Sequence, residues 1–303
     1  MKRFPSKSID LHQHWWSGAL REELSRLDLL RGTTLRLAGE PPYELDLADH
    51  DLQRRRAADA AEGVDLSLYS LSSPLGLESL EPAAAGAVLA AWHDGAADLP
   101  EESGLWAAVG LVEPDLERLA ADLRRPRVVG LQVPATALGT PAALEVLAPV
   151  LAVAESADVP VLVHPGPAAA HAEAADLPAW WPALTDYVAQ LQAAWFAWHV
   201  AGRPLLPRLR LCFVALAGLA PLLHERLDQR GGRLGAIDPG VFYETSSFGP
   251  RAIDSLVRVV GVDPLVHGSD RPYARPTDPG LGEAFAHALF VANPARLLRG
   301  VAR

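Results

Sequence analysis

Short apolar runs alternate with alanine- and leucine-rich segments along most of this 303-residue chain. The runs are bounded by Gly, Pro or Asp, as buried strands are, and the segments between them have helical spacing, as at 83–92, 115–123 and 141–156. Strands that alternate with helices predict right-handed βαβ units and a parallel sheet. The predicted strands are 8–12, 64–71, 105–109, 128–133, 159–163, 209–214, 241–243 and 265–266.

The number of predicted strands selects the fold class. Eight strands favour a closed (β/α)8 barrel of the TIM type over an open doubly wound sheet. No glycine-rich dinucleotide motif follows an early strand. No break in composition divides the chain, so we expect a single barrel domain over residues 1–303.

Two segments interrupt the regular alternation. After a predicted helix at 18–30, short alternating stretches at 33–37 and 41–45 predict a small β-hairpin inserted near the N-terminus. The connection after predicted strand five is longer than a βα unit requires and predicts a long loop insertion. This insertion carries Trp180 and Trp181, which could form a lid or pack onto the barrel.

Composition narrows the class of protein. Half of the residues are hydrophobic and the formal net charge is -10 with scattered arginines, so neither a nucleic-acid partner nor an acidic membrane surface is expected. Cys212 is the only cysteine, which excludes an intrachain disulfide and a cysteine-based zinc site. No apolar run approaches the roughly 20 residues that span a bilayer, and the first residues lack the apolar core of a signal peptide. We therefore expect a soluble cytoplasmic protein.

Polar side chains follow several predicted strands at their carboxyl ends, where barrel enzymes place their chemistry. His12 and His14 end strand one, and because side chains at i and i+2 share a face, both imidazoles can reach one metal ion. His164 ends strand five and Asp270 ends strand eight. Three imidazoles and a carboxylate are a ligand set suited to zinc or another divalent ion, with a position left for water.

The order of these motifs resembles that of a known family. His-Gln-His at 12–14, His-Pro-Gly at 164–166, Gly-Ser-Asp-Arg-Pro at 268–272 and the closing Asn-Pro-Ala-Arg-Leu-Leu at 293–298 are similar to the amidohydrolase-related family. The branch typified by aminocarboxymuconate semialdehyde decarboxylase is the most similar, and the resemblance covers essentially the whole chain. It implies a (β/α)8 barrel that uses one divalent metal for decarboxylation, hydration or hydrolysis. It also implies that the metal ligands are His12, His14, His164 and Asp270.

The lysine count bears on the number of metals. Lys2 and Lys7 are the only lysines, so no carboxylated lysine on strand four can bridge two metals, as commonly happens in binuclear amidohydrolases. The sequence therefore favours a mononuclear site, with Zn²⁺ as the expected ion.

One position departs from the family pattern. The family usually carries a histidine and two glycines after strand six, and alignment of that strand puts Ala215 where the histidine would be. A methyl group can neither polarise a bound water nor donate a proton. His171, in the loop after His164, is the candidate to line the pocket instead. His267 is expected on the opposite face of the barrel wall from Asp270.

Four further residues are candidates for substrate binding. Trp15 follows the histidine pair and is expected at the barrel mouth, where it suits a flat apolar substrate. Arg271 could bind a substrate carboxylate bidentately, with a salt bridge at the rim as the equal alternative. Gln132 ends strand four. Ser246 follows strand seven and could bond a substrate oxygen, although turn capping is the commoner use.

Three functions fit these features. The first is a metal-dependent hydrolase of an amide, ester or lactone bond in a small, aromatic or carboxylate-bearing molecule; the metal lowers the pKa of its bound water to about 7 and Asp270 accepts the proton. The alternative is a non-oxidative decarboxylase of a small aromatic or unsaturated carboxylic acid, in which Asp270 protonates carbon. The missing strand-six histidine weakens both, and decarboxylation more. A further alternative is a barrel that binds a small molecule without turnover; an Arg- and Trp-bearing surface also permits a homodimer.

Overall fold

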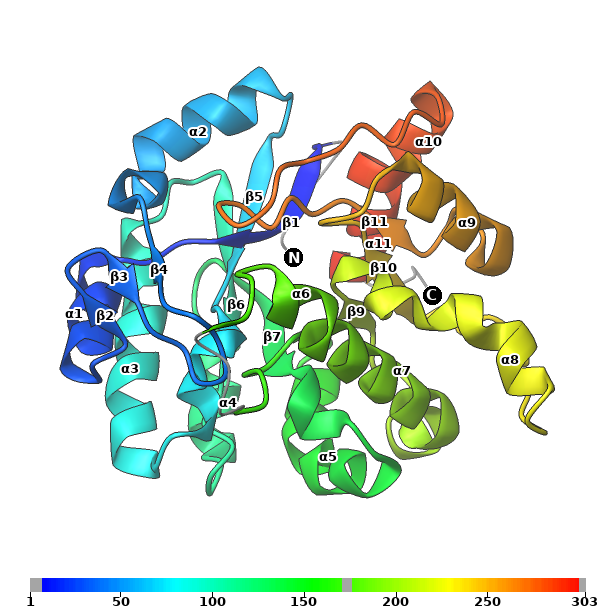
Figure 1. The fold of residues 1–303 in the computed structure, drawn as a ribbon, viewed down its shortest axis with the longest axis horizontal. Coiled ribbons are helices and arrows are strands. Elements are labelled where there is room, and N and C mark those ends of the chain that lie inside the picture. Colours follow the sequence, from blue (N-terminus) through cyan, green and yellow to red (C-terminus); the bar gives the residue numbers. More distant parts are fainter. Residues whose placement is uncertain (1–6, 171–175, 300–303) are drawn as a thin grey trace.

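A barrel of eight parallel strands forms the centre of the computed structural model, which describes residues 7–170 and 176–299 (Figure 1). Each strand pairs in parallel with the next one around the barrel. The (β/α)8 fold and all eight predicted strands are therefore confirmed. The strands are β1 (Ile9–His14), β5 (Leu66–Ser70), β6 (Ser103–Ala107), β7 (Val128–Pro134), β8 (Val161–His164), β9 (Leu211–Phe213), β10 (Val241–Glu244) and β11 (Leu265–Val266).

Hydrogen bonds beyond the last regular strand close the barrel. The N–H of Leu11 donates to the carbonyl of His267 at 3.0 Å, and the N–H of Asp270 donates to the carbonyl of His12 at 2.8 Å. Gln13 and Arg271 form a parallel bridge at the same seam. The chain after β11 thus lies against the carboxyl end of β1, which brings Asp270 to the histidine pair.

The strands are buried along their whole lengths. Every residue of the eight strands is buried, because side chains fill the barrel interior on one face and helices cover the other. This double burial explains why the strands appear in the sequence as nearly continuous apolar runs.

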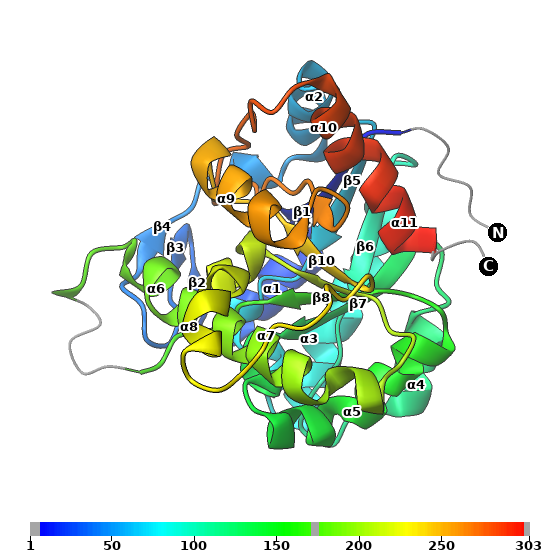
Figure 2. The same ribbon diagram turned by 90° about the vertical axis from the view of Figure 1, so that its right-hand side faces the viewer.

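Helices surround the barrel (Figure 2). Several begin at a side chain that accepts a hydrogen bond from the first turn, such as Ser17 before α1 and Thr140 before α5. No helix in the described parts of the chain is long and apolar enough to cross a membrane. The helices are α1 (Gly18–Arg26), α2 (Leu52–Ala61), α3 (Pro82–Asp94), α4 (Leu116–Asp122), α5 (Pro141–Ser156), α6 (Trp181–Leu184), α7 (Asp186–Leu205), α8 (His224–Asp228), α9 (Pro250–Val260), α10 (Glu283–His287) and α11 (Asn293–Arg299).

The N-terminal insertion has one strand more than the predicted hairpin. It is a three-stranded antiparallel sheet of β2 (Leu30–Arg31), β3 (Thr34–Leu35) and β4 (Tyr43–Glu44). Helix α1 ends at Arg26, earlier than predicted, because Asp28 takes a left-handed φ of 61° that a right-handed helix cannot continue.

The N-terminal insertion packs against the long connection after β8, which contains α6 and α7. A side chain at Gly39 would overlap the carbonyl oxygen of Ala169, so this close approach of two backbones requires glycine. The hydroxyl of Tyr187 on α7 donates to Glu40 in the insertion. Both predicted insertions therefore meet on one side of the barrel.

Candidate metal centre

The structure brings four side chains together at the carboxyl ends of the strands. One ligand atom from each lies within 4.8 Å of those of the others. The Nε2 atoms of His12 and His14 are 3.1 Å apart, and Oδ1 of Asp270 lies 3.0 Å from Nε2 of His14. The histidines are buried, whereas the Asp270 side chain is 20% exposed and marks the open side of the group. The four residues are His12, His14, His164 and Asp270.

Hydrogen bonds fix the orientation of the three imidazoles. Nδ1 of His14 lies 3.0 Å from the carbonyl oxygen of Ser70, and Nδ1 of His164 lies 2.9 Å from that of Pro165. A carbonyl oxygen only accepts, so each Nδ1 carries the hydrogen and each Nε2 lone pair is free for a ligand bond. His12 has the same orientation, but its Nδ1 lies 3.3 Å from a carboxylate oxygen.

This arrangement fits a cation. The two facing Nε2 atoms at 3.1 Å both present lone pairs in the neutral state, and positive charge between them removes their repulsion. Burial, and then the charge on His12, lowers the pKa of His14 and of His164 well below the usual value, so both stay in the neutral form that binds metals. Three imidazole nitrogens and one carboxylate oxygen suit a divalent transition metal.

The other two pKa values move upward. Burial by itself lowers the pKa of His12, but the hydrogen bond to Glu244 and the charge of Asp270 outweigh it, so the pKa is raised. Burial raises the pKa of Asp270. The direction for His12 reflects the carboxylates around it, which would also stabilise a bound cation.

Asp10 holds together the two chain segments that carry the ligands. Its Oδ1 accepts from the N–H of His12 at 3.1 Å and from the N–H of Ser269 at 3.0 Å. One buried carboxylate therefore connects the backbone of β1 to the residue before Asp270. This role of Asp10 was not predicted.

Glu244, the last residue of β10, is a further residue of the site that sequence reasoning missed. It is fully buried, and its Oε2 is the carboxylate atom beside Nδ1 of His12. An acidic residue that ends the apolar run at 241–244 could have pointed to it, because carboxylates are almost never fully buried without a partner. The partner itself lies 232 positions away in the sequence.

Two tyrosines lie at the open side of the group. The ring of Tyr273 is 5.3 Å from that of His14, measured between centroids. Partial burial raises the pKa of Tyr273 and of Tyr43 from β4, and the charge of Asp270 adds to both shifts, so both phenols stay protonated and can donate hydrogen bonds. The Tyr273 side chain is still 40% exposed. Neither was predicted as a site residue.

Ala215 lies two residues after the end of β9 and begins an unusual turn. Five successive residues from Ala215 to Leu219 have left-handed φ values between 46° and 63°. This conformation costs roughly 1–2 kcal/mol for each residue other than glycine. The turn is held from one side by α7, where Nε2 of Gln192 donates to the carbonyl of Gly218 at 2.7 Å. A methyl group thus stands at the end of strand six.

Each of the four substrate-binding candidates bonds at least one other group of the protein, although Oε1 of Gln132 is buried without a hydrogen-bond partner. Nε1 of Trp15 donates to the carbonyl of His50, and the residue is buried in the core. Nε2 of Gln132 donates to the carbonyl of Leu71 at 2.6 Å and to Oγ of Ser73 at 2.7 Å. These contacts anchor the connection after β5.

The other two candidates are engaged in the same way. Arg271 forms ion pairs with Asp59 and Glu62 near α2, which is the rim salt bridge considered above. Oγ of Ser246 donates to a carboxylate at the end of β10 at 2.7 Å. His171 lies outside the described residues. The roles of these residues toward a substrate stay predictions.

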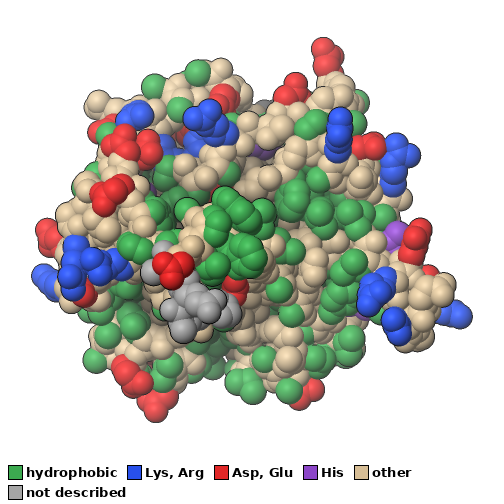
Figure 3. All heavy atoms as spheres, viewed as in Figure 1, with side chains coloured by type: hydrophobic (Ala, Val, Ile, Leu, Met, Phe, Trp, Pro, Cys, Tyr) green, Lys and Arg blue, Asp and Glu red, His purple; other side chains and the backbone are tan. Residues whose placement is uncertain are grey.

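The tryptophans of the long insertion are exposed. Hydrophobic side chains gather near the middle of the face shown in Figure 3, where Figure 1 places α6. Trp180 and Trp181 are 55% and 38% exposed, and Leu184 is 64% exposed. They are not packed into the barrel.

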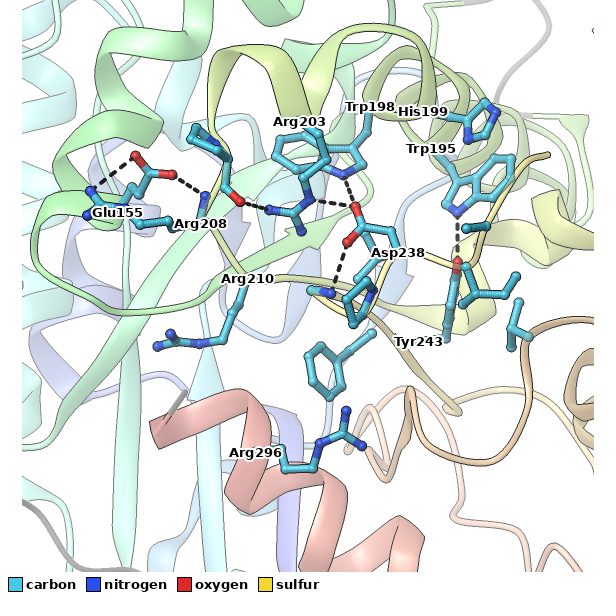
Figure 4. A pocket seen from close by; sticks show the side chains of 18 of the residues that line it. Glu155, Trp195, Trp198, His199, Arg203, Arg208, Arg210, Asp238, Tyr243 and Arg296 are labelled. Atoms are coloured by element: carbon cyan, nitrogen blue, oxygen red, sulfur yellow. Dashed lines mark hydrogen bonds and ion pairs between the residues drawn. The ribbon is translucent and has the colours of Figure 1, made fainter. Parts of the chain in front are cut away.

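A separate cavity of about 1030 Å³ lies at the opposite end of the barrel (Figure 4). Its lining includes Arg210 and Gly240, which immediately precede β9 and β10. Nε of Arg203 donates to Asp238 at 2.6 Å across this cavity wall. None of the four predicted metal ligands lines it.

Comparison with solved structures finds the same fold in several proteins described as decarboxylases and in IDCase. IDCase from Metarhizium anisopliae is 17% identical with a TM-score of 0.74, and the match covers 98% of this chain and 97% of the other. The 5-carboxyvanillate decarboxylase of Novosphingobium aromaticivorans, with bound manganese and 3-methoxy-4-hydroxy-5-nitrobenzoic acid, is 16% identical with a TM-score of 0.73; the match covers 96% and 97% of the chains.

A third similar structure is described as an amidohydrolase II. It is 20% identical with a TM-score of 0.76, and the match covers 96% of this chain and 99% of the other. No protein-family model and no curated protein matches the sequence. At these identities the likeness shows that the chain shares the barrel fold of these proteins.

Proposed function

We propose that this protein is a metal-dependent enzyme of the amidohydrolase-related family and a non-oxidative decarboxylase of a small aromatic or unsaturated carboxylic acid. The observation that carries the proposal is the convergence of three Nε2 atoms and one carboxylate within 4.8 Å at the catalytic end of the barrel. The shared fold over nearly the whole chain with decarboxylases of aromatic acids favours this reaction over hydrolysis.

The residues of the chain divide the work of this reaction. His12, His14, His164 and Asp270 would hold one divalent ion, which supplies positive charge to orient and polarise the substrate carboxylate and a neighbouring oxygen. The bond between the carboxylate carbon and the substrate breaks, carbon dioxide leaves, and the electron pair stays on the substrate carbon. Asp270, on the open side, delivers the proton to that carbon.

The identity of the ion is part of the proposal. A set of three imidazoles and one carboxylate accepts zinc or manganese, and three solved structures with this fold contain manganese. We propose one ion per chain, because no lysine is available to bridge a second.

Hydrolysis of an amide, ester or lactone is the second candidate. The observation that favours it is Ala215, which provides no proton donor after strand six. In hydrolysis Asp270 would accept the proton of the attacking water, so one carboxylate could supply the acid–base chemistry.

Metal analysis followed by a substrate screen tests the proposal. The protein is purified without chelator, its metal content is measured, and aromatic carboxylates with their amides and lactones are screened by mass spectrometry. Metal-dependent release of carbon dioxide supports decarboxylation, whereas cleavage without carbon dioxide supports hydrolysis. Metal in fewer than about a tenth of the chains would remove the basis of both reactions and leave a small-molecule-binding barrel.

A further inference from the structure

The side chain of Glu244 connects four parts of the barrel at the proposed metal site. Its Oε2 lies 3.3 Å from Nδ1 of His12 on β1 and accepts the N–H of Ala215, after β9, at 3.1 Å. Oε2 also accepts a hydrogen bond from the hydroxyl of Ser246 at 2.7 Å, and Oε1 accepts one from the backbone N–H of Ser246. A side chain at Gly268, after β11, would overlap Oε1. The carboxylate is therefore held from four directions.

Glu244 makes His12 different from the other two histidines. The Nδ1 atoms of His14 and His164 face neutral carbonyl oxygens, whereas Nδ1 of His12 faces a carboxylate. A charged acceptor binds the Nδ1 hydrogen more strongly and increases the electron density at Nε2. The negative charge of the carboxylate would also compensate the positive charge of an ion bound at the site.

The same carboxylate reaches the turn that begins at Ala215. The N–H of Ala215 is the first of the left-handed turn, and its bond to Glu244 sets where the turn leaves β9. The position at which the family usually carries a histidine is thereby tied to the acceptor of a metal-binding histidine. A displacement of His12 or of the turn at Ala215 would therefore affect the other through the side chain of Glu244.

We propose that Glu244 is a positioning residue that orients His12, strengthens it as a ligand, and anchors the strand-six turn to the metal site. The inference rests on the proposed metal site but not on which reaction occurs there. Because all four contacts are made inside the barrel wall, Glu244 acts through His12 rather than on a substrate.

The substitution Glu244→Gln tests this role with a nearly unchanged shape. The affinity for Co²⁺ and Mn²⁺ is measured by competition with a chelator, and the visible absorption spectrum of the Co²⁺ form reports the ligand geometry. We expect a loss of metal affinity of about 10- to 100-fold and a changed spectrum. Replacing the hydrogen-bond partner of a metal-binding histidine has effects of this size. Glu244→Asp, which retains the charge but withdraws it from His12, should give an intermediate loss.

Glu78→Gln is the matched control. Glu78 is also a buried carboxylate, 1% exposed, and no described hydrogen bond joins it to the four ligands. This variant should keep the wild-type affinity and spectrum. Thermal unfolding in chelator confirms that each variant is folded; if Glu244→Gln is not, Glu244→Asp decides.

Two outcomes are distinguishable. If the wild-type protein binds neither ion, the proposed function fails. If the wild type binds and the folded Glu244 variants match it in affinity and spectrum, the proposed function stands and the role of Glu244 is refuted.

Discussion

The two ends of this barrel treat charged side chains differently. At the N-terminal end, three of the four arginines that line the cavity of Figure 4 each lie beside a carboxylate, and the charges of each pair neutralise one another within the chain. At the C-terminal end, imidazole lone pairs face each other and a carboxylate at 3.0–3.6 Å without a basic side chain among them. The pairs at the N-terminal end are Arg203–Asp238 at 2.6 Å, Arg208–Glu155 at 3.7 Å and Arg210–Asp158 at 2.8 Å.

This difference shows how a site can be recognised without a ligand. The N-terminal end has the wide cavity, but three of its four arginines are paired with carboxylates of the same chain. The C-terminal end has convergent imidazole nitrogens and one carboxylate, an arrangement that suits a cation. In (β/α)8 proteins the first arrangement serves stability and the second serves chemistry. The pairing of opposite charges within the chain is therefore a better guide here than the volume of a cavity.

The largest effect is expected when a predicted metal ligand at the C-terminal end of the barrel is replaced. His164→Ala removes one ligand, and Asp270→Asn removes the negative charge with little change in shape. Each variant should lose most of its bound metal after dialysis, because three remaining ligands hold a divalent ion much less tightly. His199→Ala, a histidine that lines the cavity at the other end, should keep the wild-type content. Equal metal in all three variants, measured by elemental analysis, would refute the ligand assignment.

The next prediction concerns a buried carboxyl at the metal end. Glu78, in η3 (Leu77–Ser79) after β5, makes no ion pair with any described residue, and burial raises its pKa from 4.5 to about 7. Between these values the unfolded chain releases the proton while the folded chain keeps it, so this group stabilises the fold fully below pH 4.5 and loses that contribution as pH rises to 7.

The wild type should therefore lose about 3 kcal/mol of unfolding free energy between pH 4 and 8 through this group, a loss that Glu78→Gln lacks. Urea unfolding of both proteins at several pH values measures the difference. Parallel pH profiles for the two proteins would contradict the shift.

A smaller effect is expected when the N-terminal end is broken. Arg203→Ala leaves Asp238 and the carbonyl oxygens of Leu206 and Leu209 without the guanidinium that they bind. The free energy of unfolding should fall by about 2 kcal/mol, measured by urea titration, while the metal content stays unchanged. Loss of metal in this variant would show that the two ends are coupled, against the comparison above.

The smallest effect should come from the left-handed turn. Ala215→Gly places glycine at a φ of 46°, where it has no steric penalty, and should stabilise the protein by up to about 1 kcal/mol after its greater unfolded-state entropy is counted. Urea unfolding measures this gain. A clear loss of stability would mean that the methyl group packs better than its partly buried position indicates.

The strands, and the convergence of the four predicted metal ligands, were predictable because they depend on local pattern. Burial on both faces made every strand an apolar run, and three of the four ligands stand at the end of such a run. The third strand of the insertion was missed because 18–30 has a continuous helical pattern, and only the left-handed Asp28 ends the helix at Arg26.

Side-chain directions beyond the strand ends were less predictable. Trp15 follows the histidine pair in sequence, but the chain turns there and its indole donates into the core at His50. The contact between Glu244 and His12 depends on barrel closure, which no local pattern encodes. Contacts between side chains from distant parts of the chain were therefore not predictable from the sequence.

The seam between the first and last strands has a consequence for biosynthesis. Asp10 binds the N–H of Ser269 across 259 positions of the chain, and both lie beside predicted metal ligands. Closing so long a loop is an intrinsically slow step in folding. The proposed metal site can therefore assemble only after synthesis has passed Asp270, so that ion uptake would report a closed barrel.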